Sequence, residues 1–186
     1  MRLILGVVTA LALGSQAALS VATMSPGAVS VVNGNLQPVG EMTLRETPNG
    51  FLIRLDLQAN PPGIAPGAHA IHPHEVGECV PPFTSAGAHF NPAGRKHGFL
   101  AAEGKHVGDL PNLHVPANAK LTVEFLIAQE PRASEKGGLL DADGFALVIH
   151  QSADDYKSDP AGASGDRIAC GAFRPSSQPK STQPKR

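Results

Sequence analysis

The chain has 186 residues, a formal net charge of −1 and 41% hydrophobic residues, which fits one domain around a single hydrophobic core. Residues 18–173 hold ten Lys and Arg against sixteen Asp and Glu, a net charge of about −6, so the charge excludes a nucleic-acid-binding domain. Nothing in the sequence repeats, and we expect residues 18–174 to form one domain.

The first residues predict a secretory signal peptide. Met1 and Arg2 give a short positive start, residues 3–13 are almost wholly apolar, and Ser15-Gln16-Ala17 offers small residues for cleavage. The predicted signal peptide is residues 1–17, with cleavage as late as residue 20 as the alternative. A membrane anchor is the competing interpretation, but a spanning helix needs about 20 apolar residues and this run is shorter. We therefore expect an exported protein without a membrane span.

Alternating apolar residues predict antiparallel strands. Apolar residues alternate with polar ones over residues 53–57 and again over residues 121–125. Between the stretches 41–44 and 51–53 lies the sequence Thr-Pro-Asn-Gly at 47–50. An Asn-Gly pair in this position predicts a hairpin, because both residues tolerate positive φ.

The remaining pattern favours an all-β fold. Residues 145–149 form a buried run that ends at His150, and no stretch after residue 20 has a convincing helical period. The 20 Gly and 17 Pro favour a β-sandwich or barrel with long loops. The longest irregular segment runs from residue 75 to about residue 116. Segments of this length in compact domains are usually functional or disordered.

Cys79 and Cys170 are the only cysteines. Export into an oxidising compartment favours a disulfide between them. A thiolate metal site is the alternative, but the two residues lack the close paired spacing of structural zinc sites.

Six of the eight histidines form an ordered series with one aspartate: His72, His74, His89, His97, His106, Asp109 and His150. Residues i and i+2 of a strand share a face, so His72 and His74 can reach one ion, and His150 can join them from a neighbouring strand. Four imidazoles, the fourth from His89, suit copper. Three imidazoles and a carboxylate suit tetrahedral zinc, and His89, His97, His106 and Asp109 offer that set. Each motif alone is weak, since a His-x-His pair is at least as often exposed or hydrogen-bonded as metal-bound.

Together these motifs resemble the signature blocks of the copper,zinc superoxide dismutase family. The blocks are GAHAIHPHE at 67–75, SAGAHFNP at 85–92, KHG at 96–98, HVGDLPN at 106–112, LVIHQSADD at 147–155 and GDRIACG at 165–171. They occur in the family's order and span residues 29–173. The position of Cys79, just after the His-x-His block, is similar to that in the bacterial secreted, periplasmic type.

The resemblance implies a Greek-key antiparallel β-sandwich or barrel with long metal-binding and active-site loops. It assigns copper to His72, His74, His89 and His150, and zinc to His89, His97, His106 and Asp109. His89 would bridge both ions. Arg167 matches the arginine that holds the anionic substrate, and Asp154 matches a carboxylate that hydrogen-bonds one copper ligand and one zinc ligand. Lys120 and Lys136 are further candidates for attracting an anion.

The implied function is the conversion of superoxide to oxygen and hydrogen peroxide by alternate reduction and oxidation of copper, with His89 supplying a proton. A nonenzymatic copper or zinc protein, for storage or delivery, is the alternative from another class. A third possibility is a structural zinc site without copper. Both monomers and homodimers occur on this scaffold. One departure from the family is Pro73, which removes a ladder donor between two copper ligands but holds His72 extended.

The last twelve residues differ from the rest. Residues 175–186 are rich in Ser, Gln, Pro and Lys and hold no apolar run to bury. They predict a disordered basic tail.

Overall fold

The computed structural model describes residues 27–128 and 136–174, and these form strands, turns and loops. One 3-10 turn, η1 (Thr84–Ala86), is present, and no α-helix occurs in the described residues. The strands are β1 (Ala28–Asn33), β2 (Pro38–Thr47), β3 (Gly50–Leu57), β4 (Gly67–His69), β5 (Ile71–His74), β6 (Leu113–Val115), β7 (Leu121–Ile127), β8 (Phe145–His150) and β9 (Arg167–Phe173). The all-β prediction is confirmed.

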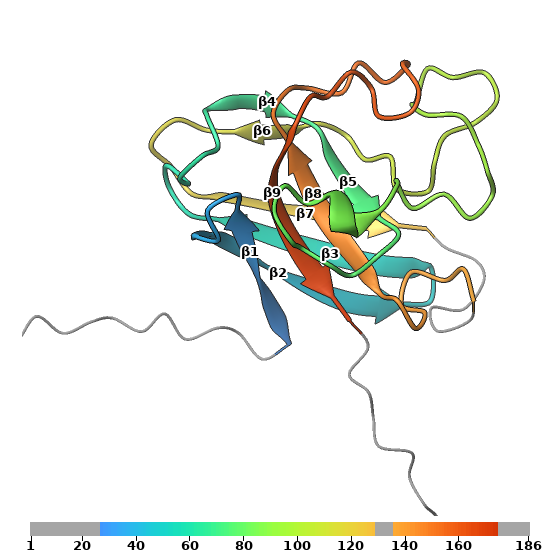
Figure 1. The fold of residues 1–186 in the computed structure, drawn as a ribbon, viewed down its shortest axis with the longest axis horizontal. Helices are drawn as coiled ribbons and strands as arrows, with labels where there is room; N and C mark the ends of the chain where they lie inside the picture. The colour runs from blue at the N-terminus through green and yellow to red at the C-terminus, as the bar shows by residue number, and fades with distance from the viewer. Residues whose placement is uncertain (1–26, 129–135, 175–186) are drawn as a thin grey trace, which may run out of the picture.

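Seven strands form one curled antiparallel sheet in the order β5-β8-β9-β1-β2-β3-β7, and β4 pairs with β6 in a second, small sheet. Figure 1 shows the large sheet bending around the core like part of a barrel. The chain crosses from β3 to β5, and later from β7 to β8, between opposite sides of the sheet. These long crossings give the Greek-key connectivity that was expected.

The core follows from the alternation that the sequence shows. In β3 the side chains of Phe51, Ile53, Leu55 and Leu57 are buried, while those between them are not. Strand β8 differs because all its residues are buried. Its Leu147 packs into the main core, whereas Val148 packs on the opposite face in a smaller cluster with Phe83. Loops therefore cover the outer face of β8, the strand that ends in His150.

The predicted hairpin forms, but its turn lies one residue earlier than an Asn-Gly turn. Thr47 pairs with Gly50, so Pro48 and Asn49 occupy the turn. Gly50 alone among these has a positive φ, at 122°. The fixed φ of Pro48 suits the first turn position, and the Thr47 hydroxyl accepts a hydrogen bond from Asn49 N.

Two long segments lie at the same end of the molecule, one before β6 and one between β8 and β9 (Figure 1). A disulfide joins Cys79 in the first segment to Cys170 in β9, as predicted. The irregular segment ends earlier than expected, because β6 begins at Leu113.

No helix in the described part of the chain is long and apolar enough to cross a membrane. The predicted signal peptide at 1–17 and the predicted tail at 175–186 both lie outside the described residues.

Candidate metal centre

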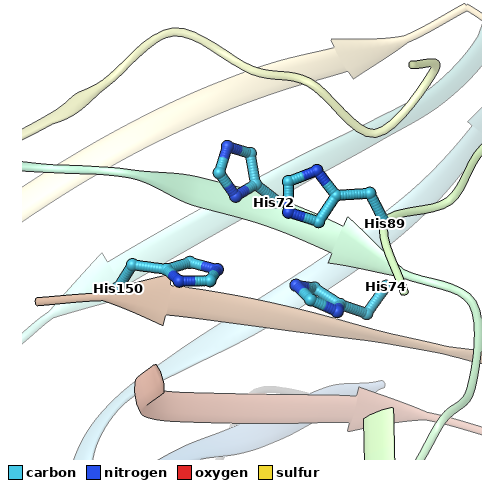
Figure 2. Close-up of side chains that lie close together, drawn as sticks. All are labelled: His72, His74, His89 and His150. Carbon is cyan, nitrogen blue, oxygen red and sulfur yellow. The ribbon is translucent and has the colours of Figure 1, made fainter. Parts of the chain in front are cut away.

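Strands β5 and β8 bring three of the predicted ligands together. These strands pair antiparallel, with His72 opposite Val148, and the His150 amide donates to the Ala70 carbonyl at 2.9 Å. His72 and His74 lie two residues apart on β5, and Figure 2 shows their rings gathered with those of His89 and His150. One ring nitrogen from each of these four residues lies within 4.8 Å of the others, and all four residues are buried.

The fourth ring arrives on a loop that pairs with the outer edge of β5. Phe90 N donates to the Pro73 carbonyl at 2.8 Å, and Glu75 N donates to the Ala88 carbonyl at 3.0 Å. These two bonds lie on either side of His89 and set it opposite His74. The edge position of β5 therefore fixes where His89 enters the site.

Each of the four rings has one nitrogen bound within the protein and one without a hydrogen-bond partner. His72 Nε2 lies 2.8 Å from Asp154, His74 Nδ1 lies 3.0 Å from the Gly87 carbonyl, and His150 Nδ1 lies 3.1 Å from the Ser164 hydroxyl. The buried nitrogens without a partner are His72 Nδ1, His74 Nε2, His89 Nε2 and His150 Nε2. A buried polar atom without a partner is costly, so four such nitrogens facing one point fit a metal ion.

A second group, His89, His97, His106 and Asp109, meets around one carboxylate oxygen. Asp109 Oδ1 lies 3.2 Å from His89 Nδ1, 2.9 Å from His97 Nδ1 and 3.1 Å from His106 Nδ1. The contact with His97 lacks hydrogen-bond geometry, so this buried nitrogen has no hydrogen-bond partner. The other carboxylate oxygen accepts hydrogen bonds from the amides of Gly98 and His106. Three nitrogens and one fixed oxygen fit tetrahedral zinc.

Asp154 joins the two groups. Its Oδ2 lies 2.8 Å from His72 Nε2 and its Oδ1 lies 3.0 Å from His97 Nε2. These three residues also offer ligand atoms within 4.8 Å of one another, close enough to hold a metal ion. The nitrogens in question are those turned away from the two candidate ion positions, however, so hydrogen bonds account for this group. Asp154 therefore orients one ring of each group.

Burial and hydrogen bonds shift the pKa values of several of these residues. Burial lowers the pKa of His89 to about 4 and that of His150 to about 3, and it holds the pKa of His74 well below its ordinary value. Burial alone would raise the pKa of a carboxyl group. Hydrogen bonds from the imidazoles outweigh it, so the pKa of Asp154 falls to about 2 and that of Asp109 lies below its ordinary value. At neutral pH these three imidazoles are therefore neutral and the two carboxylates are ionised, as metal binding requires.

Arg167 lies beside the four-histidine group in an open pocket of about 690 Å³ that His89 and His150 also line. Its guanidinium donates to the carbonyls of Phe83 at 2.7 Å and Gly87 at 2.8 Å. Both carbonyls belong to the loop that the disulfide ties to β9. The remaining N–H groups of a guanidinium held in this way are free to receive an anion.

The structure gathers every predicted ligand, but neither lysine proposed to attract an anion lines the pocket of Arg167. Lys120 lines a pocket that shares no residue with it, whereas Lys136 lines a neighbouring pocket that shares Glu75 and Asn91 with it. His69 and His114 take no part in either group. Both ring nitrogens of His69 lie 2.8 Å from backbone carbonyls, and His114 is exposed.

Sequence reasoning missed three residues that hold the site. Asn112 exchanges two hydrogen bonds with the backbone of Asp154, at 2.8 and 2.9 Å. Tyr156 binds the same region, and Gly162 lies against Asp154 so closely that a Cβ atom would overlap the carboxylate. Asn112 lies within a family block, but no spacing rule marks the other two. The one available signal was that Tyr156 is the only tyrosine.

Comparison with known proteins agrees with this geometry. Residues 39–173 match the family model described as copper/zinc superoxide dismutase (SODC). A Cu-Zn superoxide dismutase of Aquifex aeolicus is 46% identical over 147 residues, covering 77% of this chain and 84% of the relative. One of Caulobacter vibrioides is 40% identical over 148 residues, covering 76% and 81%.

Solved structures agree as well. A mutant of a superoxide dismutase-like protein from Bacillus subtilis superposes with a TM-score of 0.72 at 38% identity, covering 80% of this chain and 98% of that one. The Cu/Zn superoxide dismutase of Brucella abortus gives 0.61 at 24% identity, covering 79% and 98%, which supports the fold alone.

Proposed function

Because the chain belongs to the copper/zinc superoxide dismutase family, we propose that it is an exported enzyme that disproportionates superoxide at a copper ion and a zinc ion sharing His89. The observation that carries this proposal is the set of four buried ring nitrogens without partners, one of them His89 Nε2. The opposite nitrogen of the same ring faces Asp109 in the second group.

The proposed ligands follow from the nitrogens that face each centre. Copper would be held by His72 Nδ1, His74 Nε2, His89 Nε2 and His150 Nε2. Zinc would be held by the Nδ1 atoms of His89, His97 and His106 and by Asp109 Oδ1. Both sets match the donor preferences of these metals.

When bound, copper would supply a one-electron couple that oxidises one superoxide to oxygen and reduces a second to peroxide. The residues of the chain do the rest. Arg167 binds the anion in the pocket and keeps it beside His89, since two backbone carbonyls fix the guanidinium. His89 would take up a proton from solvent on Nε2 in the half of the cycle in which this nitrogen does not hold copper, and would pass it to the peroxide, whose second proton would come from solvent. Asp109 and Asp154 keep the surrounding rings in orientation.

Export is the second half of the proposal. The disulfide between Cys79 and Cys170 fits an oxidising compartment, and the predicted signal peptide at 1–17 would direct the domain at 18–174 there. We place the protein in the bacterial periplasm. Recovery of the disulfide-bonded protein from a periplasmic fraction, with a new N-terminus between residues 18 and 21, would support this, and an uncleaved cytoplasmic protein would contradict it.

Metal analysis combined with a superoxide dismutation assay tests the enzymatic proposal. We expect one copper and one zinc per chain, activity in the wild type, loss of copper in His72→Ala and retained copper with low activity in Arg167→Ala. A protein that binds both metals but has no activity would favour the storage alternative. An active His72→Ala protein would overturn the copper assignment.

A further inference from the structure

Tyr156 is in neither metal group, yet its polar atoms reach both sides of the segment that carries two of the proposed zinc ligands. Its hydroxyl oxygen accepts a hydrogen bond from Asn112 N at 2.7 Å, and its carbonyl accepts one from Leu100 N at 2.9 Å. Leu100 and Asn112 stand before and after the pair His106 and Asp109 in the chain. One residue thus fixes both ends of that stretch.

Tyr156 is also hydrogen-bonded to Asp154, the residue that joins the two metal groups. Its backbone N donates to Asp154 Oδ1 at 2.6 Å. That oxygen also lies 3.0 Å from His97 Nε2. Through Tyr156, the segment that carries His106 and Asp109 is therefore anchored to the Asp154 carboxylate, which orients the zinc ligand His97.

Close packing between Gly98 and Tyr156 leaves Tyr156 little room to move. Gly98 has φ +97°, and a Cβ atom there would lie 2.0 Å from the Tyr156 carbonyl oxygen. Gly98 N also donates to Asp109 Oδ2 at 2.8 Å. The ring of Tyr156 meets that of Phe99 edge to face, with centroids 5.2 Å apart. A shift of Tyr156 would therefore be transmitted directly to the Asp109 carboxylate.

The backbone of Tyr156 supports a positioning role. Its φ is 61°, in the left-handed region that side-chain-bearing residues seldom adopt. Such a conformation persists where the surroundings hold it in place, and it is concentrated near functional sites.

We propose that Tyr156 is a positioning residue for the zinc half of the centre, whose hydroxyl and carbonyl oxygens set His106 and Asp109 against His89. This inference rests on the proposed zinc site. It predicts selectivity, because His72, His74 and His150 sit on β5 and β8 and none of the hydrogen bonds of Tyr156 reaches those strands. Loss of the hydroxyl should weaken zinc binding and leave copper binding nearly unchanged.

The Tyr156→Phe variant tests this with minimal change. It keeps the ring, the backbone amide and the carbonyl, and it removes only the acceptor of Asn112 N. We expect zinc to bind about tenfold more weakly in chelator competition, and the same for Co²⁺, which serves as a visible probe of the zinc site. This is the lower end of the loss in affinity that follows when a group supporting a metal ligand is removed. Copper affinity, measured without zinc, should stay within about twofold, because the variant keeps the Tyr156 amide that donates to Asp154 and changes no contact of β5 or β8. The Co²⁺ d–d spectrum should also change shape, which a simple loss of stability would not produce.

Thr47→Val is the matched control. It also removes a hydroxyl that accepts a hydrogen bond from a backbone N–H, in this case that of Asn49. Thr47 lies in the β2–β3 hairpin, which carries no proposed ligand. It should leave both metal affinities unchanged.

Tyr156 also gives a direct readout, since the chain has one tyrosine and no tryptophan. Zinc added to the metal-free wild type should protect this fluorescence from acrylamide quenching. In His106→Ala the same zinc concentration should give no protection.

Three results would overturn the inference. One is a Tyr156→Phe protein with wild-type zinc affinity. The second is an equal loss of both metals that follows a lowered melting temperature of the metal-free protein. The third is a wild-type protein that, with copper bound, does not bind Co²⁺ through histidine nitrogens. This result would contradict the proposed zinc site itself, and it can be recognised before any variant is made.

Discussion

Gly162 is the position where a single methyl group should damage the metal centre without touching a ligand. It lies in the segment between β8 and β9 with φ +66°. A Cβ atom there would lie 1.8 Å from Asp154 Oδ1 and 2.7 Å from His97 Nε2. The Asp154 side chain is fully buried and bound to two imidazoles, so it has no free space to enter. In Gly162→Ala the carboxylate must leave its place or the segment must move.

The expected loss can be worked out from these contacts. If the carboxylate is displaced, His72 and His97 both lose the acceptor that orients them. Removing such support typically weakens metal binding by about 10- to 100-fold, or about 1.4 to 2.7 kcal/mol. Because Asp154 contacts one ring of each group, copper and zinc affinities should both fall. This distinguishes Gly162→Ala from Tyr156→Phe, in which zinc alone should be affected.

The control for this experiment is Gly94→Ala. Gly94 has φ +58°, so an alanine there incurs a similar backbone cost of about 1–2 kcal/mol, but no atom lies within 4 Å of its Cβ position. Chelator competition for each metal, with thermal unfolding of the metal-free proteins alongside, separates steric displacement from strain. If the two alanine variants bind copper and zinc equally well, the assigned role of Asp154 is wrong.

Three further predictions concern the disulfide, the histidines and the substrate. Replacing Cys79 and Cys170 by Ser should destabilise the metal-free protein by about 4–5 kcal/mol in urea unfolding, since the bond closes a loop of 91 residues; a change below about 1 kcal/mol would contradict the chain-entropy argument. The metal-free protein should also lose at least about 3 kcal/mol between pH 6.5 and pH 5. The unfolded chain binds protons at His89 and His150 while the folded-state pKa values of about 4 and 3 keep them neutral, and His74, whose pKa is also lowered, adds to this loss. A flat stability profile over that range would count against neutral buried rings. Turnover should slow as ionic strength rises from about 0.01 to 0.15 M, because the Debye length falls from about 30 to 8 Å over this range. Arg167→Ala should make the rate less dependent on salt. A wild-type rate that rises with salt would refute attraction of the anion by Arg167.

Strands could be predicted where buried and less buried residues alternate, or where a short apolar run is continuous. The alternation at 53–57 and 121–125 falls within β3 and β7, and the apolar run at 145–149 falls within β8. The short strand β6 was not predicted, because three residues carry no periodic signal. Its pairing with β4 depends on tertiary contacts rather than on its own sequence.

The ligands could be predicted because histidines are few and their series is ordered, and Asp154 followed from the family resemblance, whereas the other residues that hold the ligands could not be predicted. The side chains of Asn112 and Tyr156 bind backbone amides and carbonyls, which every sequence has. Their contacts cross about forty residues, and such a distance leaves no local spacing to recognise. Gly162 is one of 20 glycines, and only the position of Asp154 distinguishes it from the others.

Pro73 shows how a departure from the family pattern can be neutral for the site. On β5, the backbone of residue 73 faces the loop rather than β8, since its carbonyl accepts from Phe90 N at 2.8 Å. Adjacent residues of an antiparallel strand direct their hydrogen-bonding groups to opposite sides, so His72 and His74 are the residues that bond to β8. The N–H that proline lacks is therefore not one of the bonds that hold these two histidines in place. An edge strand is the position in a sheet that tolerates proline, and the fixed φ restricts the backbone between the two proposed copper ligands.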